Sequence, residues 1–277
     1  MSPSVLILGC GFTGLRLARR LIARGIALTV TTRDPERLHE LERAGVQILA
    51  IDAARREDLE RLCGAVTDGA RVVHSIPPLE NGGVYSDETP ALIEALGARP
   101  SRVVYLSTTG VYGAAREVDE HTAPAPRTAR ETLRVSAERA VAGGPWPSLV
   151  LRPAAIYGPG RGIHESMKRG EFRLRDDGSN WVSRIHVEDL AAHVEAALFS
   201  TVTGAFPVAD EHPCPSREIA GFCARLLGVP MPGSVPAGAL SETRRADRRV
   251  DGSAIRKRLG VVLRYPSYRT GIPASLE

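Results

Sequence analysis

The sequence lacks any long hydrophobic run. No stretch of its 277 residues reaches the roughly 18 apolar residues that a membrane-spanning helix needs. The chain starts with Met1-Ser-Pro-Ser and goes directly into a short apolar segment, so we expect no signal peptide and no membrane anchor. These absences predict a cytoplasmic protein.

Paired cysteines and concentrated positive charge are also absent. Cys10, Cys63, Cys214 and Cys223 form no C-x-x-C pair and have no metal-ligand spacing to a histidine, which predicts reduced thiols and no metal site. The formal net charge is only +4, and the arginines are scattered along the chain. Nucleic acid binding needs a concentrated basic face. We therefore expect a small phosphate-bearing ligand rather than nucleic acid. The sequence leaves open whether the protein forms a homodimer.

The strongest pattern that is present lies near the N-terminus. Residues 5–8 are apolar and too few for a helix, which indicates a buried parallel strand, whereas apolar residues in 15–22 recur at helical spacing. Between them stands a Gly-x-Gly-x-x-Gly turn, in which glycines allow a sharp bend, close approach of a pyrophosphate and tight helix packing. A purely structural turn is the alternative. The predicted phosphate-binding residues are Gly9, Gly11, Phe12, Thr13 and Gly14.

The second predicted strand, residues 26–32, bears on which cofactor is used. An NAD-specific fold places Asp or Glu about 20 residues after the glycines to bind the ribose. Thr32 and Arg33 stand there instead, a pair that accepts a 2′-phosphate, so we expect NADP, with NAD the alternative. Asp34 and Pro35 are typical of the N-cap and first position of a helix. In the other interpretation, Asp34 binds the ribose and Arg33 is solvated.

Strands and helices continue to alternate along the chain. Strands are predicted over residues 46–51, 71–76 and 102–107, with a helix over 90–96 before the last of them. This alternation predicts an α/β fold with a doubly wound parallel sheet that binds its ligand across the carboxyl ends of the strands. At such ends, Asp52 could accept from the adenine amino group or have a simple turn or helix-cap role, and Ser75 is a further candidate cofactor contact.

Three later blocks make a family resemblance specific. They are Leu-Ser-Thr-Thr-Gly-Val-Tyr-Gly over 106–113, Leu-Arg-Pro-Ala-Ala-Ile-Tyr-Gly-Pro-Gly over 151–160 and Arg-Ile-His-Val-Glu-Asp-Leu-Ala over 184–191. With the glycine turn, they resemble the extended short-chain dehydrogenase/reductase superfamily of the NAD-dependent epimerase/dehydratase type. The resemblance implies a Rossmann domain over 1–160, to which 184–200 return, a smaller substrate lobe over 161–277, and hydride chemistry on nucleotide-linked sugars.

The resemblance also locates catalytic positions, two of which are altered. Thr108 matches the Ser or Thr that hydrogen-bonds the reacting oxygen in the family. The Tyr-x-x-x-Lys pair of the family falls on Arg130 and Arg134, and no tyrosine in the chain has a lysine four residues later, because the only lysines are Lys168 and Lys257. The chain therefore resembles atypical members of the family.

Replacements for this pair can be named. Arg134 could bind the nicotinamide ribose as the lysine does, but an arginine does not titrate at a relevant pH. Tyr112, close to Thr108 in sequence, is the nearest alternative proton donor, with a packing role as the other interpretation.

Candidate substrate-binding residues lie in the later blocks. Arginines can bind a diphosphate or a carboxylate through two hydrogen bonds, although most arginines in such a chain are solvated. The candidates are Arg152, Tyr157, Arg161 and Arg184, followed by a cluster of Arg244, Arg245, Arg248 and Arg249. We interpret His74 and His186 as structural.

Two functions fit this sequence. One is an NAD(P)-dependent oxidoreductase or epimerase-like enzyme that acts on a nucleotide sugar or a related small carbonyl or hydroxyl compound, with rearranged acid and base residues. The other is a catalytically silent NADP(H)-binding sensor, which the absent Tyr-x-x-x-Lys pair favours.

Overall fold

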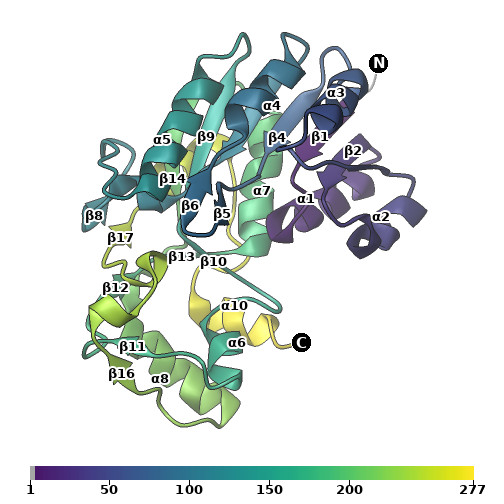
Figure 1. Cartoon of the computed structure of the whole chain (residues 1–277). Helices are drawn as coiled ribbons and strands as arrows, with labels where there is room; N and C mark the ends of the chain where they lie inside the picture. Colours follow the sequence, from purple (N-terminus) through teal and green to yellow (C-terminus); the bar gives the residue numbers. More distant parts are fainter. Residues whose placement is uncertain (1–3) are drawn as a thin grey trace. The chain divides into compact units, whose positions relative to one another are not determined.

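The computed structural model describes residues 4–277, except for the side chain of Asn81. Met1–Pro3, at the start on which the expectation of no signal peptide rests, lie outside the described residues. The chain folds as two units. Unit 1 is Met1–Val111, Pro126–Arg152 and Ala191–Ala205, and unit 2 is Tyr112–Ala125, Pro153–Leu190 and Phe206–Glu277 (Figure 1). Unit 2 thus begins earlier, and in more pieces, than the boundary predicted at residue 160.

Within the described residues, seven strands form the main sheet in the order β14-β9-β7-β4-β1-β2-β3. The neighbouring pairs β1–β2, β2–β3, β1–β4, β4–β7 and β7–β9 are all parallel. The strand order reverses beside β1, and a doubly wound sheet binds ligands at that point. The strand bounds are β1 Ser4–Leu8, β2 Ala27–Thr32, β3 Gln47–Ala50, β4 Arg71–His74, β7 Arg102–Leu106, β9 Ser148–Pro153 and β14 Gly204–Val208. The predicted doubly wound α/β class is confirmed.

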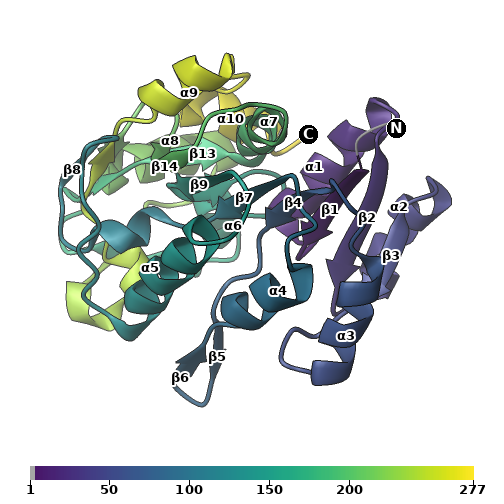
Figure 2. The same cartoon turned by 90° about the horizontal axis from the view of Figure 1, so that it is seen from above.

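Helices lie on both faces of the sheet of unit 1. Seen from above in Figure 2, α3, α4 and α5 lie on one face and α1 lies on the other. These helices are amphipathic; in α1, Leu17, Ala18 and Leu21 are buried, while Arg19 is exposed. The helix bounds are α1 Phe12–Ala23, α2 His39–Arg43, α3 Arg56–Ala65, α4 Thr89–Leu96, α5 Ala129–Ala142 and α7 Val187–Leu198, with 3-10 turns η1 Pro35–Leu38 and η2 Thr109–Tyr112.

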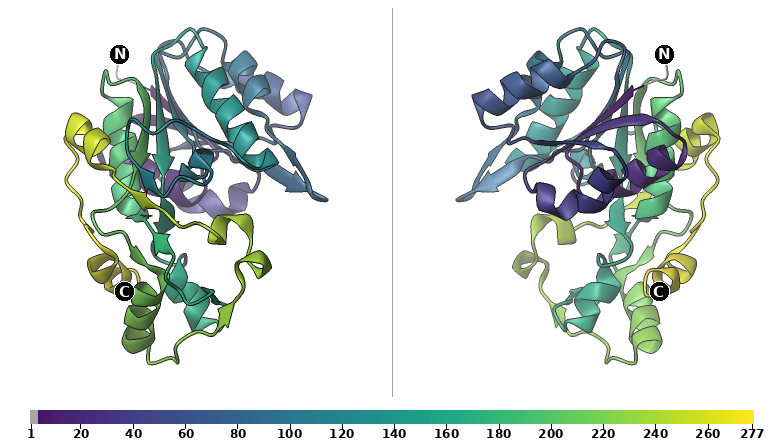
Figure 3. Two further views of the ribbon diagram at one scale, coloured as in Figure 1. Left: turned by 90° about the vertical axis from the view of Figure 1, so that its left-hand side faces the viewer. Right: turned by 90° about the vertical axis from the view of Figure 1, so that its right-hand side faces the viewer.

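A hairpin between β4 and α4 was not predicted. Its strands, β5 Leu79–Asn81 and β6 Val84–Ser86, pair antiparallel. The hairpin projects beyond α4 in Figure 2 and appears as the protruding blue arrow in the left panel of Figure 3. Val84 at its tip is 70% exposed.

Unit 2 consists of short strand pairs and short helices. Tyr157, Met167, Ile219, Tyr268 and Ile272 belong to its hydrophobic core. The strands are paired as β10 Ala155–Tyr157 with β13 Arg184–His186, β11 Leu174–Arg175 with β16 Ser234–Val235, β12 Trp181–Val182 with β15 Cys214–Pro215, and β8 Glu117–Val118 with β17 Arg249–Val250. The helices are α6 Ile163–Lys168, α8 Ser216–Leu227, α9 Ser253–Leu259 and α10 Tyr268–Ala274, with 3-10 turns η3 Ala237–Ala239 and η4 Glu242–Arg244.

No helix within residues 4–277 is long and apolar enough to cross a membrane.

Candidate functional site

The three glycines of the first turn have different surroundings. A Cβ atom at Gly9, where φ is +84°, would lie 2.8 Å from Cγ1 of Ile76, and one at Gly14 would lie 3.0 Å from the carbonyl oxygen of Gly9. At Gly11, no atom lies within 4 Å of such a Cβ. Packing therefore explains the first and third glycines, whereas the second borders open space that a bound group can enter.

Thr31, which was not among the residues predicted from the sequence, stabilises this turn through two hydrogen bonds. Its Oγ1 accepts the N–H of Gly9 at 2.9 Å, and its carbonyl oxygen accepts the N–H of Cys10 at 2.7 Å. The threonine is 1% exposed, at the end of β2. The sequence offered no distinct signal for it, because three of the six residues of β2 are threonines.

The start of α1 fits an anionic group. Gly11 occupies the N-cap, no side chain caps the helix, and its first turn carries no acidic residue. No acidic side chain of the helix's own first turn therefore offsets the positive end of the helix dipole. Burial raises the pKa of Cys10 to about 12, so its thiol stays neutral and does not repel a phosphate.

At the end of β2, the two candidate ribose ligands differ in their contacts. Asp34 accepts from Nε of Arg37 at 2.7 Å, and its N–H donates to Oγ1 of Thr32 at 3.1 Å. Arg33 is exposed and forms no contact of its own within residues 4–277. Asp34 stands at the predicted N-cap position of η1 but makes no side-chain capping bond.

Asp52 and Ser75 lie at neighbouring strand ends. Oδ1 of Asp52 accepts the N–H of Ala54 at 3.2 Å, which is the turn role that the sequence left open beside adenine binding. Ser75 is half-buried just after β4, where its N–H donates to the carbonyl of Leu8 at 2.9 Å. Both are placed near the carboxyl edge of the sheet.

Thr108 follows β7 and keeps a donor available. Its Oγ1 accepts the N–H of Gly110 at 3.1 Å, and within the described chain its hydroxyl donates to no other group. This contact caps the turn after β7 and leaves the hydroxyl proton for an external oxygen. Tyr112, assigned to unit 2, is only 1% exposed.

Arg134 lies in α5, which begins after the cap formed by Thr128, whose Oγ1 accepts from the N–H of Glu131 at 3.3 Å. The arginine is 6% exposed, and its Nη1 donates to the hydroxyl of Tyr105 at 2.8 Å and to the carbonyl of Leu106 at 3.3 Å. Its Nε has no hydrogen-bond partner within the described residues. The guanidinium thus lies at the carboxyl end of β7.

Arg152, a predicted substrate ligand, is engaged inside unit 1. Its Nε and Nη2 donate to the two carboxylate oxygens of Glu138 at 3.0 and 2.7 Å, and both side chains are buried. A buried charge pair of this kind is costly to break. The pair with Glu138 therefore gives Arg152 a structural role, which competes with the predicted role in substrate binding.

Two further candidates form part of the interior of unit 2. The Tyr157 hydroxyl lies 3.4 Å from the carbonyl of Ser267, and a Cβ at Gly271 would lie only 2.1 Å from it. Burial raises the pKa of Tyr157 well above its usual value. Nη1 of Arg184 donates to the carbonyl of Val182 at 3.2 Å and lies 3.3 Å from Sγ of Cys214. Arg161, by contrast, is exposed.

The later arginine cluster is largely bound to protein acceptors. Nε of Arg245 donates to the carbonyl of Leu240 at 2.7 Å, Arg248 donates to the carbonyls of Gly113 and Ala115, and Arg249 pairs with Glu117. Nη2 of Arg244 lies 3.1 Å from the carbonyl of Arg173.

The two histidines are buried in hydrogen-bonded positions. Nε2 of His74 lies 2.8 Å from Oγ1 of Thr89, and burial lowers the pKa of His74 to about 3. Nε2 of His186 lies 3.2 Å from Oγ of Ser275.

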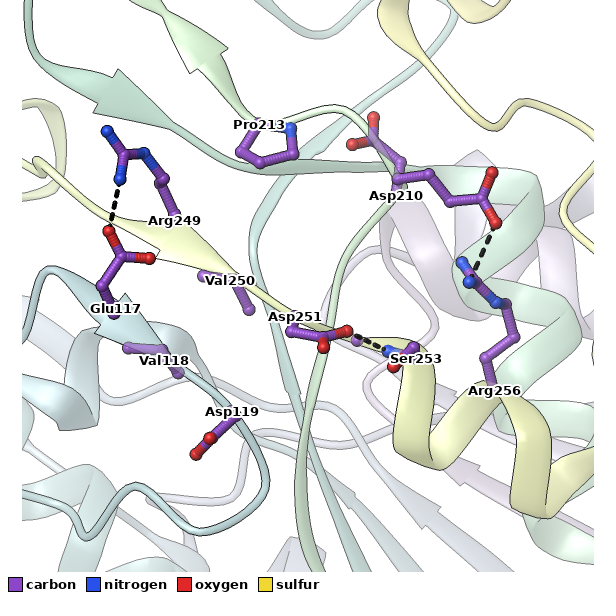
Figure 4. A pocket seen from close by; sticks show the side chains of 12 residues that line it. Glu117, Val118, Asp119, Asp210, Pro213, Arg249, Val250, Asp251, Ser253 and Arg256 are labelled. Carbon is purple, nitrogen blue, oxygen red and sulfur yellow. Dashed lines mark hydrogen bonds and ion pairs between the residues drawn. The ribbon is translucent and has the colours of Figure 1, made fainter.

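A pocket of about 580 Å³ lies within unit 2, away from every candidate residue named so far except Arg249. Five carboxylates and two arginines line it, and Figure 4 shows Glu117 paired with Arg249 and Asp251 bonded to Ser253. Its excess of acidic groups disfavours a phosphate ligand. The start of α1 at Gly11, whose first turn carries no acidic residue, is therefore the better candidate for a phosphate.

Cys10, Cys63, Cys214 and Cys223 are free thiols. Within residues 4–277, no group of three or more His, Cys, Asp or Glu side chains is arranged to hold a metal ion.

The chain belongs to the NAD dependent epimerase/dehydratase family, whose model matches residues 5–205. It is 28% identical to a 3-diazoavenalumate denitrifying reductase from Streptomyces sp, and the match covers 97% of this chain and 98% of the reductase.

Two solved structures are similar in fold to this chain. A conserved protein of unknown function from Silicibacter pomeroyi is 32% identical, with a TM-score of 0.82 and coverage of 99% of this chain and 98% of that one. A UDP-glucuronic acid 4-epimerase from Bacillus cereus, solved with UDP-glucuronic acid and NAD, has a TM-score of 0.79 at 18% identity, covering 98% and 97% of the two chains. At that identity the second likeness shows the fold alone.

Proposed function

We propose that this protein is an NADP(H)-dependent oxidoreductase that acts on a carbonyl or hydroxyl group of a small molecule, a class that includes nucleotide sugars. The observation that carries the proposal is the start of α1 at Gly11, where open space meets a helix end with no side-chain cap and no acidic residue in its first turn. When bound, the nicotinamide would give or accept a hydride.

The residues of unit 1 divide the cofactor between them. The backbone of Gly9, Gly11 and the first turn of α1 would hold the phosphates through N–H groups and the helix dipole. Arg33, which is exposed and uncommitted, would pair with a 2′-phosphate. Asp52 would contact the adenine through Oδ2, since its Oδ1 already accepts the N–H of Ala54. Ser75 would lie beside the bound cofactor at the end of β4.

Thr108 would act on the substrate. It can donate one hydrogen bond to the reacting oxygen and thereby hold it in place. A hydroxyl of this kind is too weak an acid to complete a reduction alone, so Tyr112 or a water molecule would deliver the proton. Arg152, Tyr157, Arg161 and Arg184 remain proposed substrate contacts, of which only Arg161 is exposed.

Two relatives support this class of chemistry. The Streptomyces relative is named as a reductase, and the Bacillus cereus structure holds a nucleotide sugar together with NAD. The name of the first protein and the fold that both share with this chain support hydride transfer as the proposed chemistry.

A catalytically silent NADP(H) sensor is the second candidate. It is favoured by the missing Tyr-x-x-x-Lys pair and by the 1% exposure of Tyr112, which limits its use as a proton donor.

Turnover separates the two functions. The purified protein is incubated with NADPH or NADH and a panel of UDP-sugars, ketones and aldehydes, and the reverse direction is run with NADP and the matching alcohols. Cofactor oxidation followed at 340 nm, together with a reduced product identified by mass spectrometry, is the expected result. Tight NADPH binding with no turnover on any compound would favour the sensor, and no cofactor binding would reject both.

A further inference from the structure

A buried polar group lies under α4 and α5 in unit 1. Ser107 directly follows β7, two positions after Tyr105, and its N–H still donates to the carbonyl of Leu151 in β9 at 2.8 Å. The extended pairing therefore places its side chain on the same face of the sheet as that of Tyr105. Tyr105 packs with Leu92 of α4 and Ala137 of α5, which identifies that face. Arg134 of α5 lies on the same side, because it bonds to the Tyr105 hydroxyl.

The position of Tyr105 is tightly determined. Its side chain is 0% exposed, and its ring lies 4.9 Å from the ring of His74. Nε2 of that histidine is in turn 2.8 Å from Oγ1 of Thr89 at the start of α4. Burial raises the pKa of Tyr105, so its hydroxyl stays neutral. Tyr105 is therefore a rigid neutral acceptor that substrate and solvent do not reach.

Arg134 is the group that this acceptor holds. The guanidinium is buried, yet its Nε has no partner within the described residues. Oγ of Ser107 is likewise buried without a partner there. Buried polar groups are normally satisfied, so these atoms mark a polar region near the end of β7 that protein groups satisfy only in part. The 6% of Arg134 that stays exposed is the part that an outside group can reach.

The cofactor is long enough to supply that partner. β7 is the second strand from β1 in the sheet, so the two strand ends are roughly 10 Å apart at about 4.8 Å per strand. A dinucleotide with phosphates at Gly11 extends from them in both directions, and Arg33 accounts for its adenosine half on the side of β2. Its second ribose then lies toward β7.

We propose that Tyr105 is a positioning residue, which holds the guanidinium of Arg134 so that it faces the nicotinamide half of the cofactor. This inference rests on the proposed function. Without the hydroxyl, a buried guanidinium loses one of its two protein acceptors and turns toward another, which misplaces the donor for the cofactor.

The test is Tyr105→Phe, which removes the hydroxyl and keeps the ring. Dissociation constants are measured for NADPH and for ADP, which has the adenosine and both phosphates but no second ribose. We expect NADPH to bind about tenfold more weakly, a loss of about 1.4 kcal/mol, while the affinity for ADP is unchanged. A merely structural role would weaken both ligands or neither.

Tyr268→Phe is the matched control. Tyr268 is 1% exposed, and its hydroxyl donates to Oε1 of Glu218 at 2.7 Å. The Tyr268→Phe variant therefore also lacks a buried tyrosine hydroxyl that bonds to a charged group, but this group lies in unit 2. Its NADPH affinity should equal that of the unmodified protein. A similar NADPH loss in this variant would overturn the specific role of Tyr105.

A double-mutant cycle with Arg134→Met completes the experiment. Tyr105→Phe should add nothing to the loss caused by Arg134→Met, because the hydroxyl acts through the arginine. The double variant leaves no unpaired buried charge, so it stays informative if Tyr105→Phe alone does not fold. Full NADPH affinity in a folded Tyr105→Phe or Arg134→Met protein overturns the inference and leaves the proposed function intact, whereas no NADPH binding by the unmodified protein overturns both.

Discussion

At the residue scale, cofactor preference depends on which charged group is uncommitted at the end of β2. Asp34 is paired with Arg37 at 2.7 Å, whereas Arg33 is exposed and has no contact of its own within residues 4–277. The Asp34–Arg37 pair is exposed and therefore weak, so the proposed preference rests on Arg33, whose exposed guanidinium can pair with a phosphate. This pattern favours a 2′-phosphate at that position.

We therefore predict that Arg33→Ala lowers the affinity for NADPH roughly 10- to 100-fold, because a hydrogen bond to a charged group is worth about 1.5–3 kcal/mol. The affinity for NADH should not change. Titration of each cofactor by protein fluorescence measures both constants. Arg43→Ala, at another exposed arginine of unit 1, is the control. Equal affinities of the unmodified protein for NADPH and NADH would contradict the prediction.

Thr108 offers a second test at this scale. Thr108→Val keeps the shape of the side chain but removes both the hydroxyl donor and the acceptor for the N–H of Gly110. We expect kcat to fall roughly 10²-fold, at the low end of the effect of removing one polarising donor, with little change in NADPH affinity. Thr108→Ser restores the hydroxyl and should recover most of the rate. Full activity of the valine variant would leave Thr108 with only its capping role.

At the element scale, the glycine turn before α1 separates packing from ligand binding. Gly14→Ala brings a Cβ to 3.0 Å from the carbonyl oxygen of Gly9 and 3.3 Å from Cγ2 of Ile7. Overpacking of this kind costs about 1–3 kcal/mol. Gly11→Ala meets no protein atom within 4 Å and has a negative φ, so the protein itself tolerates it.

The two variants should therefore behave in opposite ways. Gly14→Ala lowers the free energy of unfolding measured in urea, whereas Gly11→Ala leaves it nearly unchanged and weakens cofactor binding by about tenfold or more, because the methyl group occupies the space for the phosphates. If Gly11→Ala bound NADPH as tightly as the unmodified protein, the open space would not be the phosphate site.

Element by element, the sequence predicts those parts of the fold that have a clear period. The helix over 90–96 is found as Thr89–Leu96, and the strand over 102–107 is found as Arg102–Leu106, with all five residues buried. Such runs are long enough to show their burial pattern. The helix expected after Asp34 instead splits into η1 and α2, and its predicted cap has no side-chain bond.

Short elements could not be predicted in the same way. The strands of unit 2 have only two or three residues each, as in the pair β8 and β17, and no period can be read from so few positions. The pairing of β8 with β17 joins residues that are about 130 positions apart in the sequence, with Arg249 opposite Glu117. The hairpin of β5 and β6 is equally short.

The same limit applies to the candidate site. Gly9 to Gly14 could be recognised because a local turn carries the whole signal. The partners of Arg152, Tyr157 and Arg134 could not, since Glu138, Ser267 and Tyr105 lie 14, 110 and 29 residues away from them. Which arginines are committed to protein groups is therefore a tertiary property.

At the scale of the whole molecule, two buried groups give stability opposite dependences on pH. Burial lowers the pKa of His74 to about 3, so the unfolded chain binds a proton at this histidine that the folded chain does not, and stability falls as the pH drops below about 6.5. Burial, with the nearby charges of Asp189 and Glu211, raises the pKa of Asp210 to about 7 against the effect of Arg184. Here the folded state binds the extra proton, so this stability is present at low pH and lost as the pH rises through 7.

Between about pH 4 and 6.5, the contributions of His74 and Asp210 to stability change in opposite directions with pH. Removing the ionisation of one group should therefore reveal the pH dependence that the other causes. Asp210 is 3% exposed; its Oδ1 accepts the N–H of His212 at 3.1 Å, and its Oδ2 has no hydrogen-bond partner within the described residues. Asp210→Asn keeps the shape and the acceptor without the ionisation. We predict that at pH 8 it raises the free energy of unfolding by on the order of 4 kcal/mol, with little effect at pH 4.

Urea unfolding at several pH values between 4 and 8 measures this difference. Asp251→Asn, at an exposed aspartate of unit 2 whose Oδ1 accepts the N–H of Ser253, is the control and should change stability by a similar small amount at every pH. In Asp210→Asn, stability should rise from pH 4 to 6.5 because the contribution of His74 is no longer offset. If this variant and the unmodified protein instead gave parallel curves, the carboxyl of Asp210 would titrate alike in the folded and unfolded chains, and burial would not control its proton.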